Sequence, residues 1–100
     1  MMTLIEKERI KTWFITGSSS GIGYELCHQL SQQGFNVIAA SRKVPDFNDD
    51  NILCLSADVR DPKSIKNAVE LGISKFGRID VLVNNAGISS SMTIDRKSVV

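Results

Sequence analysis

The sequence predicts an α/β fold, built from a parallel sheet with helices on its faces. Short apolar segments alternate with segments of helical periodicity along the chain, and a glycine-rich turn at residues 16–23 lies between the first apolar segment and the first helical one. Such alternation indicates parallel strands, because a crossover between parallel neighbours usually contains a helix.

The first strand is expected at the apolar run Trp13-Phe14-Ile15, and a helix is expected to follow it directly. This helix has Ile22, Leu26 and Leu30 at four-residue spacing and ends near Gly34. The spacing places the three side chains on one face, which we expect to pack against the sheet.

The turn at residues 16–23 has the composition of a phosphate-binding loop. Its glycines permit backbone torsions that a Cβ forbids, and the helix that follows presents unpaired N–H groups and the positive end of its dipole to an anion. Ser18, Ser19 and Ser20 are expected to add hydroxyl donors at the same edge. The alternative is a Gly/Ser-rich surface loop without a ligand.

The middle of the chain predicts two further strands. Residues 35–41 form an apolar, β-branched run, and residues 52–57 form another. The polar connection at 44–51 is short for a parallel crossover, so we expect it to hold one helical turn at most.

The second helix has clear signals at both ends. Asp61 suits the N-cap, Pro62 the first helical position and Gly77 the exit. Gly72 interrupts the helix, at a cost of about 1 kcal/mol relative to Ala. The stripe expected to face the sheet is Ile65, Val69, Ile73 and Phe76.

A fourth strand is expected at 79–83, followed by the segment Asn84-Asn85-Ala86-Gly87. Strand four would then be an open edge with three apolar residues, so we expect it to pair with another chain or to aggregate.

Composition and charge exclude several classes of protein. The net charge is +1 and the basic residues are scattered, which argues against nucleic-acid and membrane partners. No apolar stretch approaches the length of a membrane span, so a soluble, cytoplasmic protein of one domain is expected. Cys27 and Cys54 are expected to be core thiols without a metal or redox role, and His28 to face solvent without a role.

Four features, in order, resemble the classical short-chain dehydrogenase/reductase family. They are the Thr-Gly-x-x-x-Gly-Ile-Gly turn at 16–23, Arg42 after the second strand, Asp58-Val59 after the third, and the segment at 84–87 after the fourth. The resemblance covers residues 11–91 and implies a Rossmann-like, doubly wound parallel sheet, here truncated after about four strands. Residues 1–10 would be an N-terminal extension and residues 92–100 a truncated tail. The resemblance also implies that residues 88–100 form a loop that leads toward the family's next helix.

The resemblance also implies a binding site for a nicotinamide dinucleotide. Gly17 and the serines would face the pyrophosphate, while Gly21 and Gly23 would allow close approach and packing. Arg42 would pair with the 2′-phosphate of NADP, which favours NADP over NAD; the alternative is an arginine solvated at a strand end. The residues assigned to cofactor binding are Gly17, Ser18, Ser19, Ser20, Gly21, Ile22, Gly23, Arg42, Asp58, Val59, Asn85, Ala86 and Gly87.

The same resemblance implies roles for the later motifs. Asp58 would accept a hydrogen bond from the adenine amino group, and the Val59 N–H would serve a ring nitrogen. Asn84 would brace the sheet, and residues 85–87 would line the nicotinamide ribose. The alternatives are that Asp58 only ends a strand and that the asparagines form a plain turn.

No catalytic residues are assigned. The family's reaction depends on a serine, an asparagine and a tyrosine with a lysine four positions later, whereas the single tyrosine here, Tyr24, is followed at that distance by His28. We therefore expect the NADP-binding portion of an oxidoreductase, inactive alone. Two alternatives stay open: a non-enzymatic nucleotide-binding or interaction module that uses strand four, and a site for a flavin or another nucleotide.

Overall fold

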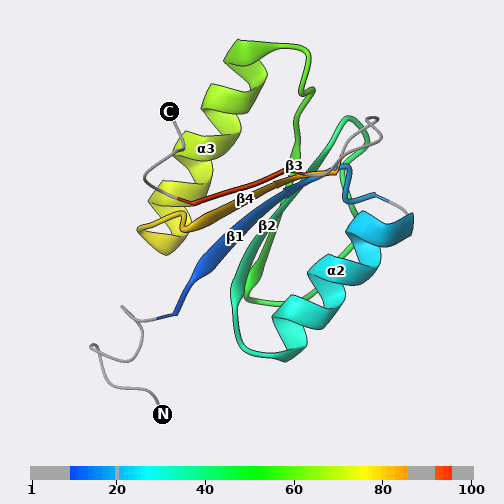
Figure 1. Cartoon of the computed structure of the whole chain (residues 1–100), viewed down its shortest axis with the longest axis vertical. Coiled ribbons are helices and arrows are strands. Elements are labelled where there is room, and N and C mark those ends of the chain that lie inside the picture. Colours follow the sequence, from blue (N-terminus) through cyan, green and yellow to red (C-terminus); the bar gives the residue numbers. More distant parts are fainter. Residues whose placement is uncertain (1–9, 20, 86–91, 96–100) are drawn as a thin grey trace.

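The computed structural model describes residues 10–19, 21–85 and 92–95, and it has an α/β architecture (Figure 1). One sheet has the strand order β3-β2-β1-β4-β5, in which the first four strands are parallel and β5 is antiparallel to β4. This confirms the predicted fold class. The elements are β1 (Thr12–Thr16), α2 (Gly21–Gln32), β2 (Asn36–Ser41), β3 (Ile52–Ser56), α3 (Pro62–Phe76), β4 (Val81–Asn84) and β5 (Met92–Asp95).

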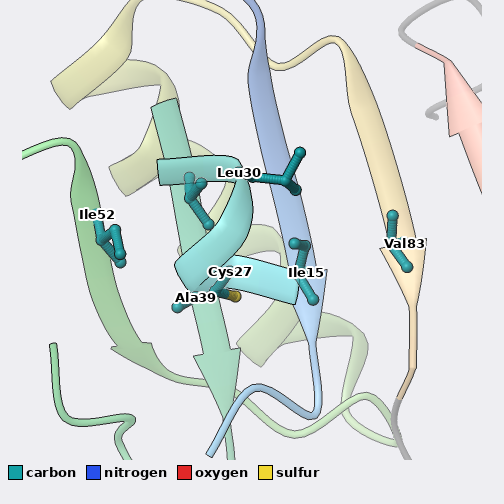
Figure 2. Packing of buried hydrophobic residues seen from close by; sticks show 7 residues of the cluster. Ile15, Cys27, Leu30, Ala39, Ile52 and Val83 are labelled. Carbon is teal, nitrogen blue, oxygen red and sulfur yellow. The ribbon is translucent and has the colours of Figure 1, made fainter. Parts of the chain in front are cut away.

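The two helices lie on opposite faces of the sheet (Figure 1). Successive side chains of a strand point to opposite faces, so each central strand contributes to two cores. On one face, Cys27 and Leu30 of α2 pack against Ile15 and Ala39, as Figure 2 shows. On the other face, α3 packs against a cluster that includes Phe14, Ile38 and Ala40.

The buried face of α2 differs from the predicted stripe at its first member. Leu30 is buried and Leu26 is half-buried, but Ile22 is 79% exposed. The helix turns Gly23 and Cys27 toward the sheet instead. A residue next to Gly23 is rotated by about 100° from it, which places Ile22 outside the interface.

The predicted ends of α3 are confirmed, and its predicted inward stripe is confirmed except at Ile73, since Ile65, Val69 and Phe76 pack against the core. The Asp61 carboxylate accepts a hydrogen bond from the Lys63 N–H, and Gly77 ends the helix with φ 81°. The buried residues of α3 are Ala68 and Gly72, whereas Ile73 is 46% exposed. Small residues occupy the interface because the helix lies close to β2.

The connection from β2 to β3 contains no helix within residues 42–51. Side chains attach it to α2 and to the turn that follows α2: the Asn51 amide donates to the carbonyls of Ser31 and Phe35, at 3.0 and 2.8 Å. The ring of Tyr24 stacks on that of Phe47 with centroids 4.4 Å apart. These contacts replace a crossover helix.

Strand β4 is not an open edge, so that prediction is wrong. Residues 92–95 form β5, which pairs with β4 in the register Val81–Asp95, Leu82–Ile94, Val83–Thr93 and Asn84–Met92. The loop expected over 88–100 is likewise wrong at 92–95, and the rest of that segment lies outside the described residues. In the described part of the chain, no helix is long and apolar enough to cross a bilayer.

Candidate functional site

The carboxyl ends of β1 and β4 lie side by side at the point where the topology of the sheet reverses direction. These strands are neighbours, and the chain leaves β1 through α2 on one face, whereas β4 follows α3 on the other. Ligands of open α/β sheets bind outside the strand ends at such a switch point. The described residues of the predicted site all follow the carboxyl ends of parallel strands, whereas Ser20, Ala86 and Gly87 lie outside the described residues.

The turn between β1 and α2 depends on three glycines. Gly17 and Gly21 have φ values of 66° and 63°, in the left-handed region that side chains disfavour. A Cβ on Gly23 would collide with the Gly17 carbonyl oxygen and would lie 2.6 Å from Nδ2 of Asn85. The close packing predicted for Gly23 is therefore confirmed, and it brings the start of α2 against the turn.

The serines of the turn do not all face outward. Ser18 is fully buried, its hydroxyl donates to the Ile15 carbonyl at 2.6 Å, and its N–H donates to the Ala40 carbonyl at 3.2 Å. The expectation of a Ser18 hydroxyl at the edge of the site is wrong, because the interior supplies a carbonyl partner. Ser19 is half-buried, and its hydroxyl oxygen accepts a hydrogen bond from Ser41 at 3.1 Å.

Thr16 connects the carboxyl end of β1 to that of β4, and the sequence analysis assigned it no role. Its hydroxyl donates to Oδ1 of Asn84 at 3.0 Å and accepts from the Asn85 N–H at 3.0 Å. The Asn85 amide in turn lies 3.4 Å from the Gly17 carbonyl. The hydrogen bond from Thr16 confirms that Asn84 braces the sheet. The only sign of the role of Thr16 in the sequence was its place at the start of the glycine motif.

The carboxyl ends of β2 and β3 lie on the same side of the sheet as those of β1 and β4. The Ala57 N–H donates to the Ser41 carbonyl at 2.9 Å, and the Ser56 hydroxyl donates to the Arg42 carbonyl at 3.2 Å. Arg42 itself is exposed. Its backbone is therefore fixed while its side chain faces solvent, as the pairing with an anion requires.

Asp58 lies just beyond β3 and is held on two sides. Its N–H donates to the Ser64 hydroxyl at 3.0 Å, and its carboxylate forms an ion pair with Arg60 at 3.0 Å. Hydrogen bonds from Arg60 lower the pKa of Asp58 to about 2, and the charge of Arg42 acts in the same direction. Asp58 is thus ionised at neutral pH. Val59 is half-buried beside it.

A model of the short chain dehydrogenase family matches residues 11–99. This chain belongs to the short-chain dehydrogenase family. It is 42% identical over 91 residues to a (+)-neomenthol dehydrogenase from Capsicum annuum, covering 78% of this chain and 29% of that protein. It is 37% identical over 89 residues to dehydrogenase/reductase SDR family member 7 from Homo sapiens, covering 76% of this chain and 26% of that protein.

Solved structures of the short-chain dehydrogenases show the same fold. The menthone neomenthol reductase from Mentha piperita superposes with a TM-score of 0.71 at 34% identity, over 80% of this chain and 32% of that one. A 3-ketoacyl-(acyl-carrier-protein) reductase from Brucella melitensis, complexed with NADH, superposes with a TM-score of 0.65 at 28% identity, over 72% and 32%. The chain spans about a third of the length of the relatives that it matches.

Two side chains with potentially reactive groups, Tyr24 and Cys27, take part in packing contacts of α2. Tyr24 lies on α2 and its hydroxyl is 3.4 Å from the Asp46 carbonyl, so this side chain belongs to the β2–β3 connection. Burial raises the pKa of the Cys27 thiol to about 11, which keeps it protonated and unreactive. Over the described ranges, no three His, Cys, Asp or Glu side chains gather as metal ligands.

Proposed function

We propose that this chain binds NADP at the carboxyl ends of β1 and β4. The observation that supports this best is the packing of Gly23 beneath the Gly17 carbonyl, which places the N-terminus of α2 beside the turn. The first N–H groups of a helix have no intrahelical acceptor, so they are suited to hold a diphosphate. Members of this family bind NAD(P).

In this proposal the pyrophosphate lies against the backbone of residues 17–23. Ser19 and Ser20 add hydroxyl donors, whereas Ser18 supports the turn from inside through its bond to the Ile15 carbonyl. Ile22 is exposed at the start of α2 and forms an apolar wall for the bound cofactor.

The two ends of the cofactor extend along the sheet edge in opposite directions. Arg42 pairs with the 2′-phosphate through charge-assisted hydrogen bonds, and Asp58 with the Val59 N–H recognises the adenine. At the other end, residues 85–87 line the nicotinamide ribose. The nicotinamide itself supplies or accepts a hydride when bound.

We propose further that these 100 residues bind the cofactor without turning over a substrate. Proton transfer to a substrate oxygen needs a positioned acid or base, and the sequence contains no tyrosine with a lysine four positions later. The dinucleotide-binding unit would comprise residues 11–91 together with β5, and a cytoplasmic location stays a prediction from the sequence. The module that pairs through an open strand four is not proposed, because β5 occupies that edge.

Titration calorimetry of the purified chain with NADPH, NADH and a flavin nucleotide tests the proposal. We expect binding of both nicotinamide nucleotides, tighter for NADPH, and none of the flavin. Replacement of Arg42 by Ala should weaken NADPH binding by about 1.5–3 kcal/mol while leaving NADH nearly unchanged, since the lost bond is to the 2′-phosphate.

The matched control is Lys66→Ala, which removes an exposed cation of α3. Equal losses for the two nucleotides in Arg42→Ala would contradict the assignment to the 2′-phosphate. No heat with either nucleotide would overturn cofactor binding altogether. Reduction of a carbonyl compound with NADPH by the chain alone would contradict the proposed inactivity.

A further inference from the structure

Arg60 makes an unusually complete contact with Asp58, although none of the four family features includes it. Its backbone N–H donates to Oδ1 at 2.9 Å, its Nε donates to the same oxygen at 3.1 Å, and its Nη2 donates to Oδ2 at 3.0 Å. The guanidinium therefore donates hydrogen bonds to both carboxylate oxygens, in the fork geometry that gives arginine–carboxylate pairs their directionality.

The contact leaves the Asp58 carboxylate able to accept a limited number of further hydrogen bonds. An ionised carboxylate has about four lone-pair sites, two on each oxygen. Among the described residues, Arg60 fills both sites on Oδ1 and one on Oδ2. One acceptor site on Oδ2 is left, and it belongs to an oxygen whose orientation the guanidinium fixes.

The backbone under this pair is fixed as well. The Asp58 N–H donates to the Ser64 hydroxyl at 3.0 Å, which attaches the end of β3 to the first turn of α3. Arg60 is itself exposed, with its side chain 72% accessible, while that of Asp58 is 32% accessible. The Arg60 guanidinium therefore contacts Asp58 from the solvent side and is not part of the core.

We propose that Arg60 is a positioning residue that turns Asp58 into a selective acceptor for the 6-amino group of a purine. This inference rests on the proposed binding of a nicotinamide adenine dinucleotide, and it deepens that proposal by naming what discriminates the base. The 6-amino group of adenine is a donor and can use the remaining site on Oδ2. A 6-keto oxygen presents an acceptor there, and two acceptors repel.

The arrangement has two physical consequences for binding. Asp58 is already ordered before the ligand arrives, so less side-chain freedom is lost on binding. The same contact also fixes the direction of the one acceptor site left on Oδ2, and an ionised carboxylate has no proton to donate to a keto oxygen. Arg60 therefore acts on the choice of base and has no direct contact with the phosphates in this scheme.

The test compares NADPH with its hypoxanthine analogue, in which a keto oxygen replaces the adenine amino group. Dissociation constants of both ligands are measured by calorimetry for the full 100-residue chain and for Arg60→Gln, Arg60→Lys and Lys66→Gln. The last variant removes a cation of α3 that is exposed and outside the site. We expect the unmodified chain and Lys66→Gln to favour NADPH by about tenfold or more, the range expected for one hydrogen bond to a charged group.

In Arg60→Gln the preference for NADPH over the analogue should fall by about fivefold, mainly through weaker NADPH binding. Arg60→Lys keeps the charge but lacks the fork, so its preference should lie between the two. An unchanged preference in Arg60→Gln, equal weakening of both ligands, or no discrimination by the unmodified chain would each overturn the role of Arg60 while leaving NADP binding in place. Binding of neither ligand would instead show that the proposed function itself has failed.

Discussion

Gly23 is the single residue on which the geometry of the candidate site depends most. In an open helix position, replacement of Gly by Ala stabilises the helix by about 1 kcal/mol. Here the added Cβ meets the Gly17 carbonyl oxygen and the Asn85 amide. We expect Gly23→Ala to destabilise the chain by about 1–3 kcal/mol, as overpacking does, and to weaken NADPH binding more than tenfold. Urea unfolding and calorimetry measure the two effects.

The control for this substitution is His28→Ala, at an exposed position of the same helix. It gains helix propensity without touching the turn, so its stability should equal or slightly exceed that of the original chain. A Gly23→Ala chain as stable as His28→Ala would show that α2 does not pack against the turn as described.

The ionisation of Asp58 gives a second prediction for one side chain. Its pKa in the folded chain is about 2, compared with the ordinary 3.8, because Arg60 stabilises the carboxylate. The lowered pKa means that the ion pair contributes fully above about pH 4 and that this contribution is lost as the pH falls toward 2. Carbon-detected NMR titration of the Asp58 carboxyl should give a midpoint near 2, rising toward 3.8 in Arg60→Gln. The same midpoint in both chains would exclude Arg60 as the cause.

The sequence was sufficient to predict backbone-determined roles, but not the direction of every side chain. Gly17 and Gly23 were identified because their chemistry depends on the absence of a Cβ, which is visible in the sequence. The inward turn of Ser18 was not, since a hydroxyl binds whichever carbonyl the folded interior presents, here that of Ile15. For the same reason the Arg60 partner of Asp58 was missed, because a sequence does not show which neighbour a carboxylate selects.

Helix α3 shows how an element can be required to contain glycine. A Cβ on Gly72 would collide with Cδ1 of Ile38, on the neighbouring β2. Gly72→Ala should therefore destabilise the chain by about 1–3 kcal/mol, in spite of its better helix propensity. Ser74→Ala, at an exposed site of α3, should cause no loss. Chemical denaturation of each variant measures the change.

The cause of that loss can be tested by removing the methyl group concerned. Ile38→Val deletes Cδ1 and alone costs about 0.5–1.5 kcal/mol. Combined with Gly72→Ala, it should relieve the collision, so that the double variant loses at least about 0.5 kcal/mol less than the sum of the single losses. Additive losses would show that the two positions do not contact each other.

The ends of the helices could be predicted from nearby residues, whereas their buried faces also depend on packing against the sheet. The ends of α3 were predicted correctly, because Asp61, Pro62 and Gly77 act on the nearest backbone groups. Each predicted buried face was correct except at one residue: Ile22 and Ile73 are exposed, because smaller residues of the same helices lie closest to the sheet. Size complementarity between α3 and β2 decides the face, and periodicity in one segment cannot show it.

Over the whole molecule, the parallel strands follow from the alternation of elements, but β5 does not. Residues 92–95 come after a segment that lacks a strong strand pattern, and the family resemblance led us to expect a loop there. The structure pairs them antiparallel with β4. A strand of four residues gains its stability from the partner whose edge it covers, so the sequence of the segment alone was insufficient.

If β5 covers β4, detaching it should make the chain self-associate, because an apolar parallel strand would become an open edge. Alternate residues of a strand direct their N–H groups to opposite sides, and β5 is the last strand of the described sheet. Proline has no N–H group to donate. One of the two variants Thr93→Pro and Ile94→Pro therefore loses a backbone hydrogen bond to β4, and the other loses only an N–H that points away from β4. We expect only one of the two variants to lose hydrogen-exchange protection in β4 and to form concentration-dependent oligomers in sedimentation velocity. Two monomeric variants with protected β4 amides would contradict the pairing of β5 with β4.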